Sequence, residues 1–191
     1  DVIDSRFAVT PVVLPDGRWL VIFNTHMSCC EYEEDRQQEA DSFAAYLHGI
    51  LDPENELALP EGTPMVLVGD TNLVQGSQPL TTLLTGQIVN EGTYGPAGPL
   101  DWDATDLADL VSHQTERRMA YTWRVDYGWY WPGRLDYVIY TDSVLDVVHS
   151  YILHTGEMSE DVLQELGLEA GDSATASDHL PHVADVVPYA R

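Results

Sequence analysis

Runs of apolar residues divide this chain into short elements of both secondary-structure types. Residues 65–68 are uninterrupted apolar, which is typical of a strand buried on both faces. From residue 40 to residue 51, apolar side chains recur three or four positions apart, which predicts a helix with one buried face. Acidic residues 33–35 suit the N-terminal end of that helix. Helices and strands mix without strict alternation, and the pattern therefore predicts a layered α/β protein.

Turn residues separate the other predicted elements. Pro15-Asp16-Gly17 lies between strand-like segments 7–14 and 19–24, which predicts a hairpin. Residues 86–106 are rich in Gly, Pro and Asp, and we expect a long surface loop there. The remaining predicted elements are helices at 78–85 and 159–166, the second capped by Ser159, and strands at 120–125, 135–140, 144–153 and 182–187.

An aromatic cluster begins within the strand predicted at 120–125 and continues beyond it. It comprises Tyr121, Trp123, Tyr127, Trp129, Tyr130 and Trp131. We expect most of these rings to pack under loops, and the alternative is a lip that contacts substrate.

The composition limits the classes of partner. The chain has 191 residues, enough for one domain, and 32 acidic residues against 8 basic ones, for a formal net charge of −24. All eight basic residues are Arg. A protein that binds long DNA normally has the opposite balance, because phosphate neutralisation supplies its affinity. The balance favours a small phosphate ester or a lipid head group, although adaptation to high salt and a plain acidic surface remain alternatives.

The two cysteines, Cys29 and Cys30, are adjacent. Neighbouring residues do not easily reach disulfide geometry, so we expect two small, partly buried thiols and no disulfide framework, with a role at the lip of the site as the alternative.

Polar side chains follow two of the predicted strands. Asn24-Thr25-His26 ends one strand, and Gly69-Asp70-Thr71-Asn72 ends another, while Ser177-Asp178-His179 comes near the end of the chain. Each tract is weak by itself, since Gly-Asp-x-Asn is often only a turn with Asx hydrogen bonds. Together they predict cleavage of a phosphate ester with the help of a metal.

Each residue type has a plausible role in that chemistry. Asp70 would take a proton from water or align it, and Asn72 would donate a hydrogen bond to the water or to a phosphate oxygen. His179 would donate to the phosphate or shuttle a proton near neutral pH. Asp178 would bind a hydrated divalent cation.

In their order along the chain, these tracts resemble the endonuclease/exonuclease/phosphatase superfamily, which includes DNases, sphingomyelinases and inositol-phosphate phosphatases. The resemblance extends over positions 24–181. The matching tracts are Asn24-Thr25-His26, Asp35-Arg36-Gln37-Gln38-Glu39-Ala40, Val68-Gly69-Asp70-Thr71-Asn72, Tyr121-Thr122-Trp123, Arg134-Leu135-Asp136-Tyr137-Val138 and Ala176-Ser177-Asp178-His179-Leu180-Pro181.

The resemblance implies a fold and a set of roles. The fold would be part of a four-layer α/β sandwich, in which two mixed sheets are flanked by helices. Asp136 would accept a hydrogen bond from His179 and fix its tautomer, and His26 would stabilise negative charge on the phosphate. Asp178 would belong to the network around the metal and its waters. The cofactor would be Mg²⁺, with Mn²⁺ or Ca²⁺ as alternatives.

The resemblance also implies that part of the domain is missing. The family's first half supplies an Asn and the Glu that is the main metal ligand, and we expect residues 1–191 to be the portion that follows it. A fragment, a partner chain with the first half, and a shortened homologue are the three explanations, of which we favour the first. Exposed apolar surface would then lead to self-association or pairing with the missing half. Localisation is left open, because a leader segment for secretion or periplasmic export would lie upstream.

The sequence thus predicts a Mg²⁺-dependent phosphoric ester hydrolase, a phosphodiesterase or phosphatase. The alternative is a binding module without activity, with an incomplete metal site. A Ser-His-Asp hydrolase centred on Ser177 is disfavoured, because Ser177 and His179 lie two residues apart in one extended segment.

Overall fold

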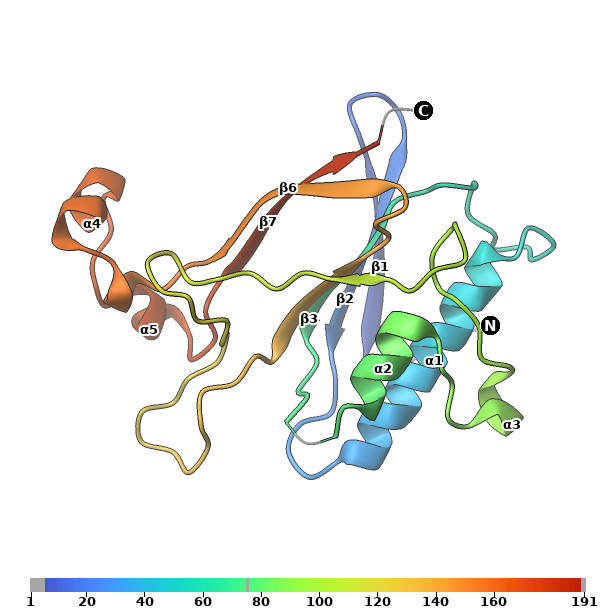
Figure 1. The fold of residues 1–191 in the computed structure, drawn as a ribbon, viewed down its shortest axis with the longest axis horizontal. Coiled ribbons are helices and arrows are strands. Elements are labelled where there is room, and N and C mark those ends of the chain that lie inside the picture. The colour runs from blue at the N-terminus through green and yellow to red at the C-terminus, as the bar shows by residue number, and fades with distance from the viewer. Residues whose placement is uncertain (1–5, 75, 190–191) are drawn as a thin grey trace. The chain divides into compact units, whose positions relative to one another are not determined.

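The hairpin predicted near the start of the chain is present, and it forms one edge of a five-stranded sheet (Figure 1). A computed structural model of the protein describes residues 6–74 and 76–189. Strand β1 (Phe7–Val13) pairs antiparallel with β2 (Trp19–His26), and the turn at Pro15-Asp16-Gly17 joins them. Gly17 has a φ of +85°, which suits a tight turn without a side chain.

The apolar run predicted as a buried strand is β3 (Met65–Asp70), which pairs parallel with β2. Strands β5 (Asp136–Tyr140) and β4 (Ala108–Asp109) complete a mixed sheet in the order β1-β2-β3-β5-β4. Because β2 and β3 are parallel, their carboxyl ends meet at one edge of the sheet. Their register places His26 directly opposite Asp70.

The long amphipathic helix α1 (Glu33–Leu51) packs its apolar side against this sheet. The ring of Phe43 stacks on Phe7 with 4.9 Å between centroids and meets the edge of Phe23 at 5.3 Å. Helix α2 (Gln78–Thr85) packs beside α1, and the short helix α3 (Glu91–Tyr94) follows. These helices and strands share one hydrophobic core.

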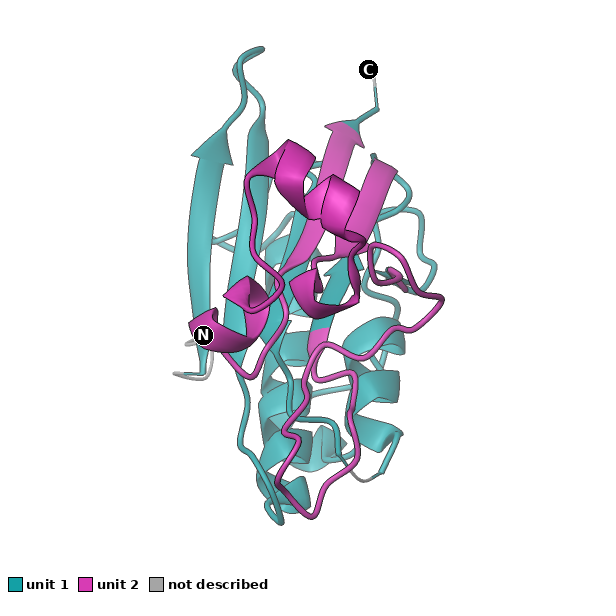
Figure 2. Cartoon of the chain, turned by 90° about the vertical axis from the view of Figure 1, so that its left-hand side faces the viewer, with its two compact units in different colours: residues 1–110, 137–146, 188–191 teal, residues 111–136, 147–187 magenta. Residues whose placement is uncertain are grey.

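The chain divides into two compact units, which Figure 2 shows in teal and magenta. The first lies within residues 1–110, 137–146 and 188–191 and holds the five-stranded sheet with its helices. The second lies within residues 111–136 and 147–187.

The second unit contains most of a two-stranded sheet, made of β6 (Leu145–Ile152) and β7 (His182–Pro188). Between these strands the chain forms a 3₁₀ turn (Thr155–Glu157) and the helices α4 (Glu160–Leu166) and α5 (Asp172–Ala176).

The predicted fold class is confirmed: the protein is a mixed α/β protein with a five-stranded and a two-stranded sheet flanked by helices. Two local predictions are wrong, and a third is confirmed only in part. No strand forms at 120–125, where only Trp123 makes an isolated bridge, because this segment bonds to loops on both sides. The segment 86–106 contains α3 and a fully buried Leu100 and is therefore more than a surface loop. Ser159 stands at the N-cap of α4 but makes no side-chain cap hydrogen bond.

Within the described residues, no helix is both long and apolar enough to span a membrane.

Candidate functional site

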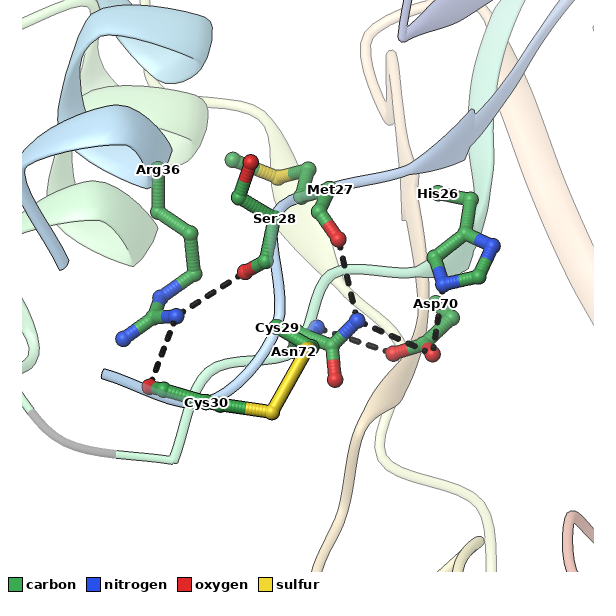
Figure 3. Close-up of a disulfide and its surroundings, with 8 residues drawn as sticks. All are labelled: His26, Met27, Ser28, Cys29, Cys30, Arg36, Asp70 and Asn72. Atoms are coloured by element: carbon green, nitrogen blue, oxygen red, sulfur yellow. Dashed lines mark hydrogen bonds and ion pairs between the residues drawn. A yellow bond between two sulfur atoms is a disulfide. The ribbon is translucent and has the colours of Figure 1, made fainter. Parts of the chain in front are cut away.

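In the first unit, the ends of β2 and β3 bring His26 and Asp70 together. His26 Nε2 lies 3.6 Å from Asp70 Oδ2, and the His26 side chain is 75% exposed while that of Asp70 is 16% exposed (Figure 3). The carboxylate is thus held in the fold, whereas the imidazole faces solvent. Asp70 is thus a fixed hydrogen-bond acceptor, and His26 is an accessible donor beside it.

Asn72 completes this group from the loop after β3. Its backbone N–H donates to Asp70 Oδ1 at 2.9 Å, and its side-chain Nδ2 donates to Asp70 Oδ2 at 3.1 Å and to the carbonyl oxygen of Met27 at 3.0 Å. Both amide hydrogens of the buried Asn72 side chain therefore bind protein acceptors. In this arrangement Asn72 orients the carboxylate of Asp70, which differs from the predicted direct donation to water or phosphate.

Gly69 allows this close approach of β3 to β2. Its φ is +129°, and a Cβ at this position would lie 2.1 Å from the carbonyl oxygen of Thr25 on β2. No larger residue fits there without separating the strands, because the neighbour is backbone and not a flexible side chain. The glycine of the Gly-Asp-x-Asn tract is therefore required by the close packing of β3 against β2.

The loop after His26 contains a disulfide between Cys29 and Cys30, so the prediction of two free thiols is wrong (Figure 3). Their Cα atoms are 3.8 Å apart, the distance between any two neighbours joined by a trans peptide. Cys30 has a left-handed backbone, with a φ of +63°.

In the second unit, Asp136 and His179 form a hydrogen-bonded pair. His179 Nδ1 lies 2.8 Å from Asp136 Oδ2, and the two side chains are 30% and 20% exposed. A carboxylate on Nδ1 favours the tautomer with the proton on that nitrogen and leaves Nε2 as the second functional atom. The hydrogen bond that the family resemblance implied is present in the structure.

Thr122 positions both members of this pair. Its buried Oγ1 accepts hydrogen bonds from the backbone N–H groups of Leu135 and Asp136, at 3.0 and 2.9 Å. Its carbonyl oxygen accepts from the N–H of Leu180, next to His179. One threonine thus ties the start of β5 to the segment that carries the histidine. Sequence reasoning included Thr122 only as part of a tract and gave it no role.

Asp178 precedes the histidine and is exposed. Trp123 Nε1 donates to Asp178 Oδ2 at 2.9 Å, and this hydrogen bond holds the pKa of the carboxyl below its ordinary value. The charge of His179 lowers this pKa further. Ser177 Oγ accepts the backbone N–H of His179 at 3.0 Å, so the serine belongs to a turn, consistent with its rejection as a nucleophile.

A divalent cation such as Mg²⁺ prefers several oxygen ligands. Within residues 6–74 and 76–189, no group of three His, Cys, Asp or Glu side chains is arranged to hold a metal. Asp178 offers one carboxylate, one oxygen of which is bound to the indole. These residues by themselves do not make a complete cation site.

Four of the six rings in the aromatic cluster are exposed, so the expectation that most pack under loops is wrong. Their exposed fractions are 95% for Tyr127, 99% for Trp129, 71% for Tyr130 and 89% for Trp131. These four rings lie between Trp123 and Gly133, which pair in an isolated bridge. The strand expected at 120–125 does not form, so it does not hold the rings against a core. These four rings are therefore accessible to solvent, and contact with a substrate stays a prediction.

Solved structures share the fold at low sequence identity. TDP2 from D. rerio, in complex with a single-strand DNA product, aligns with a TM-score of 0.50 and 16% identity over 95% of this chain and 61% of that chain. ANGEL2, a 2′,3′-cyclic phosphatase, aligns with a TM-score of 0.50 and 16% identity over 95% of this chain and 67% of its own. A mannosyl-6-phosphatase from Bacteroides thetaiotaomicron aligns with a TM-score of 0.48 and 18% identity over 90% and 52%.

This chain therefore spans about three fifths of the first of these proteins. No curated protein sequence matches it. Residues 5–179 match the sequence profile of the Endonuclease/Exonuclease/phosphatase family, whose members act on phosphate esters. The chain belongs to the Endonuclease/Exonuclease/phosphatase family.

Proposed function

We propose that this protein hydrolyses phosphate esters, with Asp70 as the group that holds or deprotonates water and His179 as the group that acts on the phosphate. The observation that carries the proposal is the 2.8 Å hydrogen bond between His179 Nδ1 and Asp136 Oδ2. A carboxylate in that position fixes the imidazole and stabilises its protonated form, so Nε2 can donate to a phosphate oxygen or transfer a proton. Membership in the family supports the same reaction class.

The first unit supplies the groups for the water and for negative charge. Asn72 donates twice to Asp70, which restricts the carboxylate to one orientation before any substrate binds. His26 is accessible beside it and can donate to a phosphate oxygen when protonated. We therefore assign to Asn72 the role of orienting the carboxylate of Asp70.

We further propose dependence on Mg²⁺, or on Mn²⁺ or Ca²⁺ in its place, with Asp178 as one ligand. Asp178 is charged at neutral pH, as a ligand to a hard cation must be, and its lowered pKa extends the charged form to more acidic pH. A bound cation would stabilise charge on the phosphate oxygens. The described residues do not complete such a site. Calorimetric titration with Mg²⁺ of the protein and of Asp178→Asn tests this assignment.

The preferred substrate is a small phosphate ester or a lipid head group. The net charge of −24 disfavours long DNA, since the electrostatic part of DNA binding would be repulsive. The exposed rings of Tyr127, Trp129, Tyr130 and Trp131 suit contact with an apolar or quaternary ammonium group. Hydrolysis rates on sphingomyelin, inositol phosphates, simple phosphodiesters and duplex DNA discriminate these classes.

We also propose self-association, or pairing with another segment, through β1. This strand lies at the edge of the sheet, and Val13 is 67% exposed and Val9 38% exposed. An edge strand with outward apolar side chains is a template for another strand. Light scattering of the protein and of Val13→Lys tests the proposal, and a monomer in both would contradict it.

The hydrolase proposal is tested by Asp70→Ala and His179→Ala in the full-length protein, assayed on a simple phosphodiester. We expect each variant to lose at least about 100-fold in kcat, which is typical for removal of a general acid or base. The matched control is His149→Ala, an exposed histidine that also lies near a carboxylate, that of Asp185 at 3.8 Å. Full activity in both test variants would contradict the proposal and favour the alternative of a binding module without activity.

A further inference from the structure

The Cys29–Cys30 disulfide lies in the loop that joins β2 to α1, beside the Asp70 group (Figure 3). These are the only cysteines in the sequence, and both are exposed in the structure. A bond between neighbours closes the shortest possible loop, so it removes little freedom from the unfolded chain. Its effect is therefore on the conformation of this loop more than on the stability of the whole fold.

The far side of the loop is held by one buried guanidinium. Arg36 Nη1 donates to the carbonyl oxygens of Ser28, at 2.9 Å, and Cys30, at 3.1 Å. Arg36 is only 1% exposed. The second of these contacts depends on the left-handed backbone of Cys30, a conformation that residues with a Cβ seldom adopt unless something imposes it. The disulfide is the covalent constraint at that residue.

The near side of the loop contacts the candidate catalytic group. The carbonyl oxygen of Met27 accepts from Asn72 Nδ2 at 3.0 Å, and the same nitrogen donates to Asp70 Oδ2. Only Ser28 separates Met27 from the disulfide, and its N–H and Oγ are both bound to Glu39. In addition, Cys29 and His26 line the same surface pocket of about 280 Å³. A change at the disulfide is thus two residues from the acceptor that orients Asn72.

We propose that Cys29–Cys30 is a site of reversible thiol–disulfide exchange with a dithiol reductant, and that its oxidation state sets the orientation of Asn72 and Asp70. A thiolate of the reductant attacks one exposed sulfur, and the S–S bond breaks to give a mixed disulfide and a cysteine thiolate. The second thiol of the reductant then displaces the other cysteine. In sum, two electrons and two protons pass to the protein, which gains two thiols, while the reductant becomes a disulfide.

Reduction releases Cys30 from its left-handed backbone, and the contact of its carbonyl with Arg36 is lost. Arg36 then holds the loop through the carbonyl of Ser28 alone. We expect the relaxation at Cys29 and Cys30 to shift the carbonyl of Met27, and with it the side chain of Asn72. Any consequence for catalysis rests on the proposed function, whereas the exchange and the movement of Asn72 do not.

The experiment compares air-oxidised protein, protein treated with dithiothreitol, and the double variant Cys29→Ser/Cys30→Ser. Alkylation and intact mass count the thiols, and the side-chain amide of Asn72 is followed by ¹H–¹⁵N NMR. We expect no alkylation before treatment, two alkylated residues after it, and a shift of the Asn72 amide that oxidised glutathione reverses. The double variant should show the reduced position in either buffer. The side chain of Asn55, in the loop after α1, is the control and should not shift.

Two free thiols in the air-oxidised protein, or an Asn72 amide that does not respond to reduction, would overturn the proposal. Phosphodiester hydrolysis by the full-length protein is then measured in both oxidation states. Displacement of a reacting group by about 1 Å can cost on the order of 100-fold in rate, so we expect a reversible loss of up to that factor on reduction. If the amide shifts while no form is active, the hydrolase proposal fails and the exchange site stands.

Discussion

Replacement of Gly69 by alanine tests whether the close approach of β3 to β2 builds the Asp70 group. The new Cβ would lie 2.1 Å from the carbonyl oxygen of Thr25, a backbone atom in the middle of a paired sheet. The strands must separate at this point, and the next register pair is His26 with Asp70. The substitution therefore affects both the stability of the protein and the geometry of the site.

Two costs add at Gly69, and they can be separated. A residue with a Cβ at positive φ costs about 1–2 kcal/mol. Overlap with a packed neighbour costs typically about 1–3 kcal/mol more, because the surroundings must shift. We therefore expect Gly69→Ala to lower the free energy of unfolding by about 2–5 kcal/mol. The control is Gly17→Ala, which is also at positive φ (+85°) but whose Cβ would meet no atom within 4 Å, so it has a backbone cost without the overlap.

Urea denaturation of both variants measures the difference between them. Gly69→Ala should lose at least about 1 kcal/mol more than Gly17→Ala, from the overlap term. It should also shift the NMR signals of the His26 ring, which Gly17→Ala should leave in place. Equal losses in the two variants, or an unmoved His26 ring in Gly69→Ala, would refute the reasoning.

Three further predictions concern the second unit. Replacement of Trp123 by Phe removes the N–H that lowers the pKa of Asp178, so this pKa should rise toward 3.8 in a carboxyl NMR titration; an unchanged value would contradict the assignment. The charge of Asp178 stabilises the fold at pH values above the pKa that this carboxyl has in the unfolded chain, and the stabilisation is lost as the pH falls through the lower pKa of the native state. Trp123→Phe should therefore weaken the dependence of stability on acidic pH. Burial lowers the pKa of His154 from 6.5, so its contribution to stability is complete above pH 6.5 and declines as the pH falls through the native pKa. Urea midpoints between pH 7 and pH 5 should therefore fall more steeply in the wild type than in His154→Gln, and parallel slopes would count against this. Thr122→Val keeps the side-chain shape but removes the acceptor of two backbone N–H groups. It should lower the free energy of unfolding by about 1–3 kcal/mol and reduce activity, whereas Thr122→Ser should keep both. Equal stability of the Val and Ser variants would show that the hydroxyl does not matter.

Most strands and helices could be predicted from local patterns. The apolar run at 65–68 and the helical spacing after residue 40 are read from neighbours in the chain, and both became the elements expected. Residues 120–125 show the limit of this reading. Their composition suits a strand, but Trp123 bonds to Gly133 and His179 in isolated bridges, and no ladder forms.

The candidate site was predicted as a set of residue types, and its internal geometry was not. The sequence placed His26 and Asp70 at strand ends, while the parallel register that sets them opposite each other is a property of the sheet. The Asn72 amide was expected to face substrate, but it binds Met27, 45 residues earlier in the chain. The indole of Trp123 bonds to Asp178 across 55 residues, a pairing for which the sequence carried no signal.

Motifs, hydrophobic periodicity and turn residues are local properties, so the sequence was enough to predict the family, the main elements and the reaction class that we propose. Tertiary packing was needed to know which hydrogen bonds orient Asp70 and His179, and that the aromatic rings after Trp123 are exposed. These depend on where distant segments meet and on how much water they exclude. Those contacts follow from packing of the whole chain, which no short window of sequence contains.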